Sequence, residues 1–175
     1  MSIFATMTFF VSDKLHVTTG LRHTDVDKEY QRTSGIGLNG THTFDDFNLD
    51  FAHEGEGTLL KDSYSESATL PSLMVQYFRD ENSMIYASYS DGFKAGGYEA
   101  LGTANPNNGL YGSEGVDATE FGYKTSNEKM KLAVNYFNSK YDGNQLSQYV
   151  YPEMGAPYTT TSNVPSTNKG FELEL

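Results

Sequence analysis

The segment KMKLAVNYFNSKYDGNQ, residues 129–145, decides the fold because its side chains fit two different periods. Its apolar side chains alternate with small or polar ones, as they would on a strand: Met130, Leu132, Val134 and Tyr136. Several of them also fall at helical spacing with Phe137 and Tyr141. The same alternation recurs in KLHVTTGLRH (14–23), SLMVQYF (72–78) and GFELEL (170–175), where a helix would mix charges and aliphatic groups on each face. We therefore predict a strand from Met130 onward, in which Phe137 fits least well.

Alternating segments occur along the whole chain of 175 residues, and no convincing long helix lies between them. We predict seven strands, at 3–11, 15–30, 64–78, 84–90, 118–125, 130–150 and 170–175. The links alternate in length, since 12–14, 79–83 and 126–129 are short and polar whereas 31–63, 91–117 and 151–169 are long. In an up-and-down antiparallel sheet, this places every tight turn at one edge and every long loop at the other. The predicted fold class is all-β.

The separation of short and long links favours an antiparallel up-and-down transmembrane β-barrel, since bacterial outer-membrane barrels keep short turns on one side and long loops on the other. The polar face of the strands, with Glu120, Lys124, Lys131 and Asn135, would line a wet lumen. The apolar face would meet lipid, and this predicted wall comprises Leu15, Val17, Leu21, Leu73, Val75, Tyr77, Phe121, Tyr123, Met130, Leu132, Val134, Tyr136, Phe171 and Leu173. A soluble β-sandwich with elaborated loops is the alternative.

The composition of the chain fits a barrel wall that faces lipid better than a domain with a compact hydrophobic core. Apolar residues make up 37% of the chain and aromatic residues 14%, whereas globular domains contain about 45–50% apolar residues in a count that also includes glycine. The formal net charge of −11 makes nucleic acid an unfavourable partner, because its phosphates would be repelled. The chain has no cysteine, so disulfides, thiolate metal sites and cysteine nucleophiles are excluded. No apolar run reaches the roughly 18 residues of a membrane-spanning helix.

One segment carries a more specific pattern than periodicity. MIYASYSDGFKAGGYEA, residues 84–100, resembles the hallmark barrel segment of TonB-dependent outer-membrane receptors, in which Tyr-Ala-Ser-Tyr-Ser leads into a Gly-Phe-Lys-x-Gly-Gly turn. EGVDATEFGYKT, residues 114–125, is similar to the next strand of that family, with Glu120, Gly122 and Lys124 at matching spacing. Three further segments resemble others in family order: VSDKLHVTTGLRHT (11–24), KLAVNYFNSKYDGNQLS (131–147) and NKGFELEL (168–175).

The resemblance implies a 22-stranded barrel with an N-terminal plug and a TonB box. The chain departs from that pattern in its small number of predicted strands, in lacking a plug or TonB box, and in ending at Leu175 without a terminal aromatic residue. We therefore expect residues 1–175 to be a partial barrel domain from the middle of a larger barrel, unable to fold alone. An autonomous eight-stranded barrel would need one more strand and a closing register.

The resemblance also implies a function, that of an active-transport receptor in the outer membrane of a Gram-negative bacterium and not of an enzyme. The implied ligand is an iron–siderophore complex, less often a cobalamin or a saccharide, and no cofactor is expected. The implied partners are outer-membrane lipid, the TonB complex acting through the plug, and the small-molecule ligand. A passive porin or small structural barrel, and a soluble β binding module, are the alternative functions.

Candidate sites are few. His16, His23, His42 and His53 are scattered, and no catalytic constellation or metal site is predicted. His23 shares one side of its predicted strand with Asp25 and Asp27, which suits either a ligand contact or a face turned to a wet lumen. The acidic segment 45–57 is a calcium candidate without EF-hand spacing, and a solvated external loop explains it better.

Two further predictions concern the long loops. Aromatic side chains in external loops are the candidate ligand-binding residues, namely Tyr98, Tyr111, Tyr151 and Tyr158. The glycine-rich GFKAGG lacks the order of a phosphate-binding loop, and we expect Gly92, Gly96 and Gly97 to adopt positive φ where a strand leaves the wall. NGT at Asn39 is a glycosylation sequon by pattern only.

Overall fold

The computed structural model describes residues 1–34, 58–99, 109–151, 153 and 158–175 of the chain. These residues contain strands and turns but no helix. The strands are β1 (Ser2–Phe10), β2 (Leu15–Ser34), β3 (Thr58–Asp80), β4 (Ser83–Lys94), β5 (Gly97–Tyr98), β6 (Leu110–Tyr111), β7 (Glu114–Ser126), β8 (Lys131–Val150) and β9 (Tyr158–Glu174). No helix able to cross a membrane is found in the described part of the chain.

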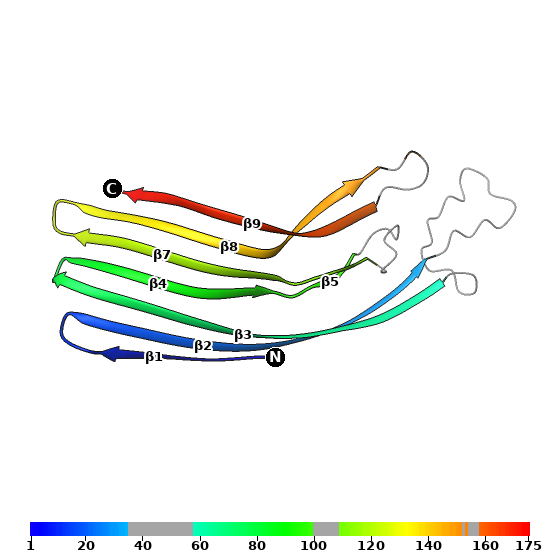
Figure 1. Cartoon of the computed structure of the whole chain (residues 1–175), viewed down its shortest axis with the longest axis horizontal. Coiled ribbons are helices and arrows are strands. Elements are labelled where there is room, and N and C mark those ends of the chain that lie inside the picture. Colours follow the sequence, from blue (N-terminus) through cyan, green and yellow to red (C-terminus); the bar gives the residue numbers. More distant parts are fainter. Residues whose placement is uncertain (35–57, 100–108, 152, 154–157) are drawn as a thin grey trace, which may run out of the picture. The chain divides into compact units, whose positions relative to one another are not determined.

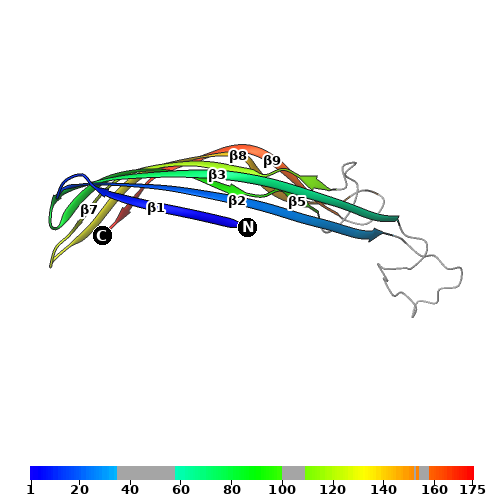
Figure 2. The same ribbon diagram turned by 90° about the horizontal axis from the view of Figure 1, so that it is seen from below.

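The chain divides into two units. Unit 1 comprises Met1–Val26 and Glu66–Leu175, and unit 2 comprises Asp27–Ser65. Unit 2 contains the last residues of β2 and the first of β3, and in it Ser65 Oγ donates a hydrogen bond of 2.9 Å to Asp27 Oδ1. Unit 1 contains strand segments of the seven-stranded sheet, in the order β1-β2-β3-β4-β7-β8-β9. Its strands lie side by side in a single curved layer (Figures 1 and 2).

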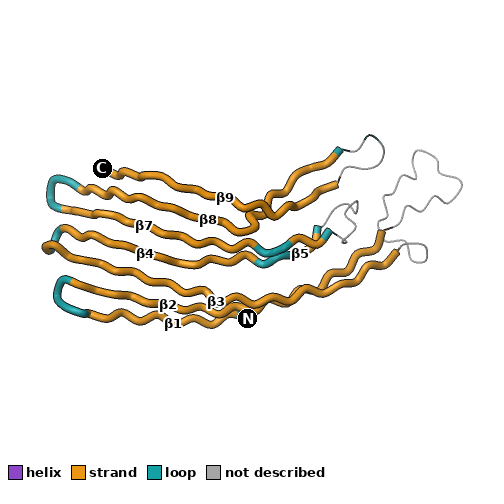
Figure 3. The backbone as a smooth tube through the Cα atoms, viewed as in Figure 1, coloured by secondary structure: helices purple, strands orange, loops and turns teal. Residues whose placement is uncertain are grey.

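The sheet of unit 1 is an antiparallel meander in chain order, apart from the small β5–β6 hairpin inserted between β4 and β7. The three tight turns all lie along one edge, which we call the turn side; the opposite edge is the loop side (Figure 3). The predicted all-β antiparallel class is confirmed, as is the separation of short and long links.

A side-chain oxygen stabilises each tight turn. Ser12 Oγ accepts hydrogen bonds from the Lys14 and Leu15 amides, and Asp80 Oδ1 accepts one from the Asn82 amide. Asn127 Oδ1 accepts from the Lys129 and Met130 amides at 2.9 and 3.0 Å. These bonds occupy backbone donors that the strand ladder leaves free, which explains why polar residues begin the turns.

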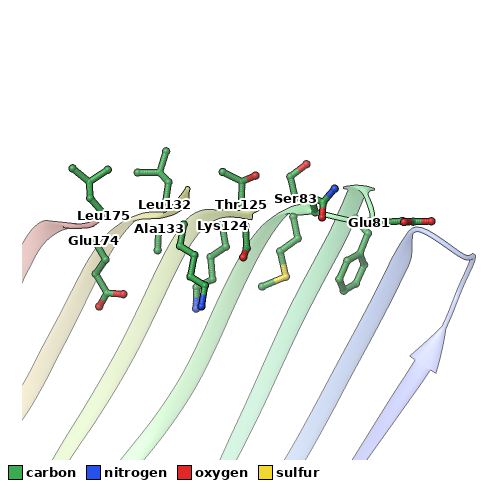
Figure 4. A pocket seen from close by; sticks show the side chains of 13 residues that line it. Glu81, Ser83, Lys124, Thr125, Leu132, Ala133, Glu174 and Leu175 are labelled. Carbon is green, nitrogen blue, oxygen red and sulfur yellow. The ribbon is translucent and has the colours of Figure 1, made fainter. Parts of the chain in front are cut away.

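Register gives the sheet two unlike faces, because residues that pair across strands share a face. The face that we call the apolar face carries pairs such as Tyr77 with Ile85 and Val134 with Leu173. The opposite face, the polar face, carries pairs such as Ser88 with Glu120. At the turn side, Figure 4 shows Leu132 and Leu175 pointing to one side of the layer and Lys124 and Glu174 to the other.

Of the fourteen residues predicted for the lipid-facing wall, all but Met130 lie in strands on the apolar face. Met130 ends the turn that precedes β8. Phe137 points to the polar face, where it covers Gly170, so that a Cβ placed on Gly170 would lie 3.1 Å from the Phe137 ring. Its poor fit to the apolar alternation therefore reflects a real position on the other face.

The structure has little core. Among the described residues, Tyr86 is the buried hydrophobic side chain, 7% exposed, and no side chain is fully buried. Large apolar groups on the apolar face are open, for example Phe121 at 58% and Phe171 at 80%. Within the described chain, no second layer of protein covers this face, and its side chains contact only their neighbours on the same sheet, as Phe171 contacts Tyr136.

The loop-side edge of the apolar face is staggered across the sheet. On β2 this face stays apolar as far as Leu21, whereas on β8 and β9 its last large apolar side chains are the paired Tyr136 and Phe171. His23 Nδ1 lies 2.9 Å from Thr69 Oγ1, and the Phe78 amide donates to the Lys14 carbonyl at 2.8 Å; both contacts give the same offset of β2 against β3. Following the pairs across the sheet puts Leu21 level with Lys140, four residues beyond Tyr136.

Several predicted strand ends were wrong. β9 begins at Tyr158 and not at 170, β7 at Glu114 and not at 118, and β3 at Thr58 and not at 64. The added lengths are mostly polar, and their few apolar residues do not alternate as those of a half-buried strand do. They pair through polar contacts instead, such as Ser147 Oγ with Thr161 Oγ1 at 2.7 Å.

The glycine prediction was also wrong. Among the described glycines, positive φ occurs at Gly109 (73°) and Gly143 (70°), and not at Gly92, Gly96 or Gly97. Gly92 instead permits close packing, because a Cβ there would lie 2.6 Å from Val116 Cγ1. Gly143 lies in a β-bulge between Tyr141 and Asn144 of β8, where an extra residue re-aims the strand.

Candidate functional site

Three of the four predicted ligand-binding tyrosines lie in strands, contrary to the expectation that all lie in loops. Tyr98 belongs to β5, Tyr111 to β6, and Tyr158 begins β9; each is half-buried. Tyr151 follows β8 in the connection to β9 and is 75% exposed. The β5–β6 hairpin brings the Tyr98 and Tyr111 positions together, since Gly97 pairs with Tyr111. β6 also contacts β9.

Asn163 of β9 joins three segments at the loop side. Its Oδ1 accepts a hydrogen bond of 2.8 Å from the Gly112 amide. Its Nδ2 lies within donor distance of three backbone carbonyl oxygens, those of Gly112 (3.0 Å), Ser113 (3.1 Å) and Gly143 (2.8 Å). One amide side chain therefore ties the link between β6 and β7 to the bulge of β8.

Gln145 of β8 holds both ends of the same hairpin. Its Nε2 donates to the carbonyl oxygen of Ala95 at 3.1 Å, before β5, and to that of Gly112 at 2.9 Å, after β6. Its backbone amide donates to Glu114 Oε2 at 2.9 Å. We call Glu114, Gln145 and Asn163, with the backbone groups that they bind, the loop-side network.

Two further contacts anchor the hairpin region. Thr159 Oγ1 donates to Glu99 Oε2 at 3.1 Å, and Glu99 is only 8% exposed. Ser113 Oγ donates to Glu66 Oε1 of β3 at 2.6 Å. The positive φ of Gly109 brings its backbone against Glu99, whose amide donates to the Gly109 carbonyl at 2.9 Å. The hairpin that carries Tyr98 and Tyr111 is thus fixed at its stem by side chains of β8 and β9.

A second cluster lies on the polar face between β4 and β7. The Tyr86 hydroxyl donates to Glu120 Oε1, and Lys124 Nζ lies 5.1 Å from the centre of the Tyr86 ring. Gly122 lies under this ring, because a Cβ at Gly122 would collide with it. Further along the same face, Asn135 Nδ2 donates to Glu172 Oε2 at 2.9 Å. The sequence pattern singled out Glu120, Gly122 and Lys124 in one segment and Tyr86 in another, as the first residue of Tyr-Ala-Ser-Tyr-Ser, but it did not predict that Tyr86 contacts the other three.

A hollow at the turn side is open to solvent and does not enclose a binding site. It is lined by residues of both faces, including Lys124 and Glu174 from the polar face and Leu132 and Leu175 from the apolar face (Figure 4). Because residues of both faces line it, this hollow is the edge of the sheet where the strands turn.

The histidines form no metal site in the part of the chain that the structure describes, where no group of three or more potential ligands comes together. His16 packs between Phe10 and Phe78, with ring centres 4.7 and 4.8 Å away. His23 lies 3.2 Å from Asp25 Oδ1. It pairs with Ile3 on the apolar face, so the expectation that it faces the polar side was wrong. His42, His53, Asn39 and the acidic segment 45–57 lie outside the described residues.

Comparisons with known proteins identify the family. The family model described as TonB dependent receptor-like, beta-barrel, matches residues 1–175. Among solved structures, the chain is similar to the copper transporter OprC (17% identity, TM-score 0.74) and to the ferric yersiniabactin uptake receptor FyuA from Yersinia pestis (18% identity, TM-score 0.73). It is also similar to the ferric-catecholate import receptor Fiu from E. coli K12 (16% identity, TM-score 0.66). No curated protein sequence gives a significant match.

These structural matches cover 98% of this chain, but only 26%, 23% and 24% of OprC, FyuA and Fiu respectively. The chain therefore spans about a quarter of the length of those proteins. At such identities the similarity shows a shared fold, that of a β-barrel segment, and confirms the predicted fold class. Because the family model matches the chain from residue 1 to residue 175, the chain belongs to the TonB-dependent receptor family, as part of its outer-membrane β-barrel.

Proposed function

We propose that this chain forms part of the wall of an outer-membrane receptor that imports a scarce ligand by TonB-coupled active transport. The ligand that we propose is an iron–siderophore complex. The observation that carries the proposal is a single-layer sheet with two unlike faces in a chain of this family. The apolar face meets lipid tails, which accounts for exposed groups such as Phe121 and Phe171. The polar face, with its Tyr86–Glu120 and Asn135–Glu172 contacts, lines the lumen.

The loop-side network supports a capturing role. A ligand that binds to an ordered hairpin meets side chains whose conformational entropy is already lost, so less of the binding free energy is spent on ordering them. Gln145 and Asn163 order the stem of the hairpin that carries Tyr98 and Tyr111. Aromatic rings such as these stack on flat or apolar parts of a chelate.

The preference for an iron chelate comes from the family and from relatives described as ferric yersiniabactin and ferric-catecholate receptors. The test is growth of a strain lacking the whole gene on a panel of single ferric siderophores, with copper limitation as a separate arm. Loss of growth on one chelate, restored by the gene, supports the proposal. Unchanged uptake of every chelate would remove the siderophore assignment.

Energy coupling is tested in the same strain. Uptake of the chelate should stop when TonB is removed, because active import draws its energy through that protein. Uptake that persists without TonB would indicate a passive porin instead.

Replacement of both Tyr98 and Tyr111 by alanine should weaken binding of the chelate to cells about tenfold or more, because both rings would stack on the chelate. The double Tyr→Phe variant should keep most of the affinity.

A further inference from the structure

A hollow of about 520 Å³ lies on the polar face of unit 1, over strands β1 to β4 and toward the loop side. Residues of this face from four adjacent strands line it, namely Phe4, Gly20, Arg22, Leu70, Ser72 and Gly92. Residues of the apolar face that border it, Asp91 among them, alternate with these along the strands, so their side chains lie on the other side of the layer. The hollow therefore opens to the side that the proposed function assigns to the lumen.

Arg22 is the charged group of this hollow. Its Nε lies within donor distance of Ser2 Oγ (2.9 Å) and Thr24 Oγ1 (3.2 Å), and these contacts orient the guanidinium. Within the described chain its two Nη groups have no hydrogen-bond acceptor, and Arg22 makes no ion pair. Because Arg22 is exposed, these donors remain available to a ligand. Two N–H groups on one planar guanidinium match the two oxygens of a carboxylate.

No described acidic side chain of the polar face neutralises Arg22. The residues opposite it are Phe4 on β1 and, from the offset of β2 against β3, Leu70 on β3. Glu66 and Glu114, acidic residues toward the loop side, accept hydrogen bonds from other partners. Neither lies within ion-pair distance of Arg22. An anion that enters the hollow therefore meets a positive charge that the described chain leaves uncompensated.

The hollow is apolar on both sides of Arg22. The Phe4 side chain is 77% exposed, and Leu70 lies on the opposite side of Arg22. At Gly20 no side chain fits, because a Cβ there would collide with Ser72 Oγ. A guanidinium flanked by apolar groups suits an anion carried on a carbon skeleton, since the carbon atoms leave water while the oxygens keep charge-assisted hydrogen bonds.

We propose that this hollow binds a carboxylate of the imported chelate, with Arg22 on the carboxylate and Phe4 against its carbon skeleton. The inference rests on the proposed function and names the class of chelate, a ferric hydroxycarboxylate with free carboxylates. Gly92 precedes Gly97 of the β5–β6 hairpin by five residues, which places the hollow about 15 Å nearer the turn side. A chelate captured at the loop side reaches it next on the way into the lumen.

The test measures binding of two ferric chelates to the full-length protein in detergent by calorimetry. Ferric citrate keeps free carboxylates, whereas a neutral ferric trihydroxamate has none. The parent protein should bind ferric citrate at least about tenfold more tightly, and Arg22→Gln should weaken that binding about 10- to 100-fold, because hydrogen bonds to a charged group are lost. Arg22→Lys should lie between the two, since lysine supplies the charge without the paired donors. Arg79→Gln, at the turn side and outside the hollow, should change the affinity less than twofold.

The two phenylalanines of β1 give a second matched pair. Phe4→Ala should weaken binding of ferric citrate about fourfold, the contribution of one methylene group that the ring covers. Phe10→Ala is the control, because Phe10 is 74% exposed on the same face and lies outside the hollow. This control should change the affinity less than twofold.

Three results would overturn the site: absent or weaker binding of ferric citrate than of the trihydroxamate by the parent protein, equal affinity of Arg22→Gln and the parent, or equal loss for both chelates in Arg22→Gln. The last result would assign Arg22 a structural role through its contact with Ser2. Heat-modifiable migration on gels verifies that each variant is folded. A gene deletion that leaves all uptake unchanged would overturn the transport function itself, whereas a failed binding test with normal gene-dependent uptake would overturn the carboxylate site alone.

Discussion

At the scale of single residues, Gly122 and Tyr86 depend on each other. The Tyr86 ring covers the backbone of Gly122, its hydroxyl binds Glu120, and Lys124 lies over the ring at 5.1 Å. Tyr86 is the buried hydrophobic residue of the described chain. In a sheet without a core, this cross-strand cluster supplies local packing that a globular protein would obtain from its interior.

Replacement of Gly122 by alanine should therefore destabilise the barrel by about 1–3 kcal/mol, because the new methyl group displaces the ring. Urea unfolding of the full-length protein in lipid vesicles measures this free energy. Gly115 of the same strand provides the control, since a Cβ there meets nothing within 4 Å. Gly115→Ala should shift the free energy by less than about 0.5 kcal/mol. Equal stability of the two variants would contradict this account of Gly122.

Gly143 is constrained differently, by its φ of 70° in the bulge of β8. Alanine at this position would adopt a left-handed conformation and place its Cβ 2.8 Å from the Ser113 carbonyl oxygen. We expect Gly143→Ala to cost about 1–2 kcal/mol of unfolding free energy. Gly143→Asn, which tolerates the left-handed region better, should cost less. The same urea experiment measures both, and an inverse ranking would contradict the role assigned to φ.

At the scale of elements, the β5–β6 hairpin and the bulge form one assembly through Asn163. This side chain binds Gly112 on both its amide and its carbonyl, and it also binds Gly143. Pro165 lies in β9 between the residues that flank the bulge, where the missing proline amide costs no ladder bond. The bulge therefore serves to bring the Gly143 carbonyl within reach of Asn163.

Replacement of Asn163 by alanine should free the hairpin stem without unfolding the sheet. The Gly112 amide, which donates to Asn163 Oδ1 in the native chain, should exchange with solvent about 5–30-fold faster, because a hydrogen bond of about 1–2 kcal/mol is lost. Hydrogen exchange of peptides spanning 109–115 measures this. Asn168→Ala, on the same strand but outside the network, is the control and should leave the exchange rate unchanged. Unaltered exchange in the Asn163 variant would contradict the role of Asn163 in ordering the hairpin stem.

The same elements show why sequence reasoning succeeded only in part. Apolar alternation located β8 within one residue of its start, because Leu132, Val134 and Tyr136 all lie on one face. The first half of β9 was not predicted, because Thr159, Thr161 and Asn163 are polar and the segment therefore shows no apolar alternation. The contacts of the loop-side network could not be predicted either, since they join residues up to 51 positions apart that come together only because of the bulge.

At the scale of the whole molecule, the two faces of the sheet require different surroundings, lipid on the apolar face and water on the polar face. Family membership assigns them to an outer-membrane barrel, and charge and burial agree with lipid on the apolar face. The resemblance found in the sequence predicted this architecture, because ordered motifs depend only on local strand pattern. It did not predict which residues meet across strands, such as Tyr86 over Gly122, because that depends on register.

An arginine placed on each face distinguishes the two solvents. Val134→Arg, on the apolar face, should cost about 2–4 kcal/mol of folding free energy in lipid vesicles, since the charge would enter hydrocarbon. Asn135→Arg, its immediate neighbour on the polar face, should cost little and can pair with Glu172. Folding titrations of both variants into vesicles measure the difference. If both cost the same, the assignment of lipid to the apolar face would be wrong.

The staggered edge of the apolar face has a geometric consequence. The level at which the apolar side chains end differs by four residues between Leu21 of β2 and Phe171 of β9, while on β4 Phe93 extends the apolar face two residues beyond the level of Leu21. With about 3.4 Å per residue along a strand and about 4.8 Å between strands, this shift corresponds to a slope of about 30°. A level membrane surface can follow such an edge only if the strands lean by a similar angle, near the roughly 35–45° inclination of outer-membrane barrels. The side chains of these strands are therefore arranged for strands that cross the membrane at an incline.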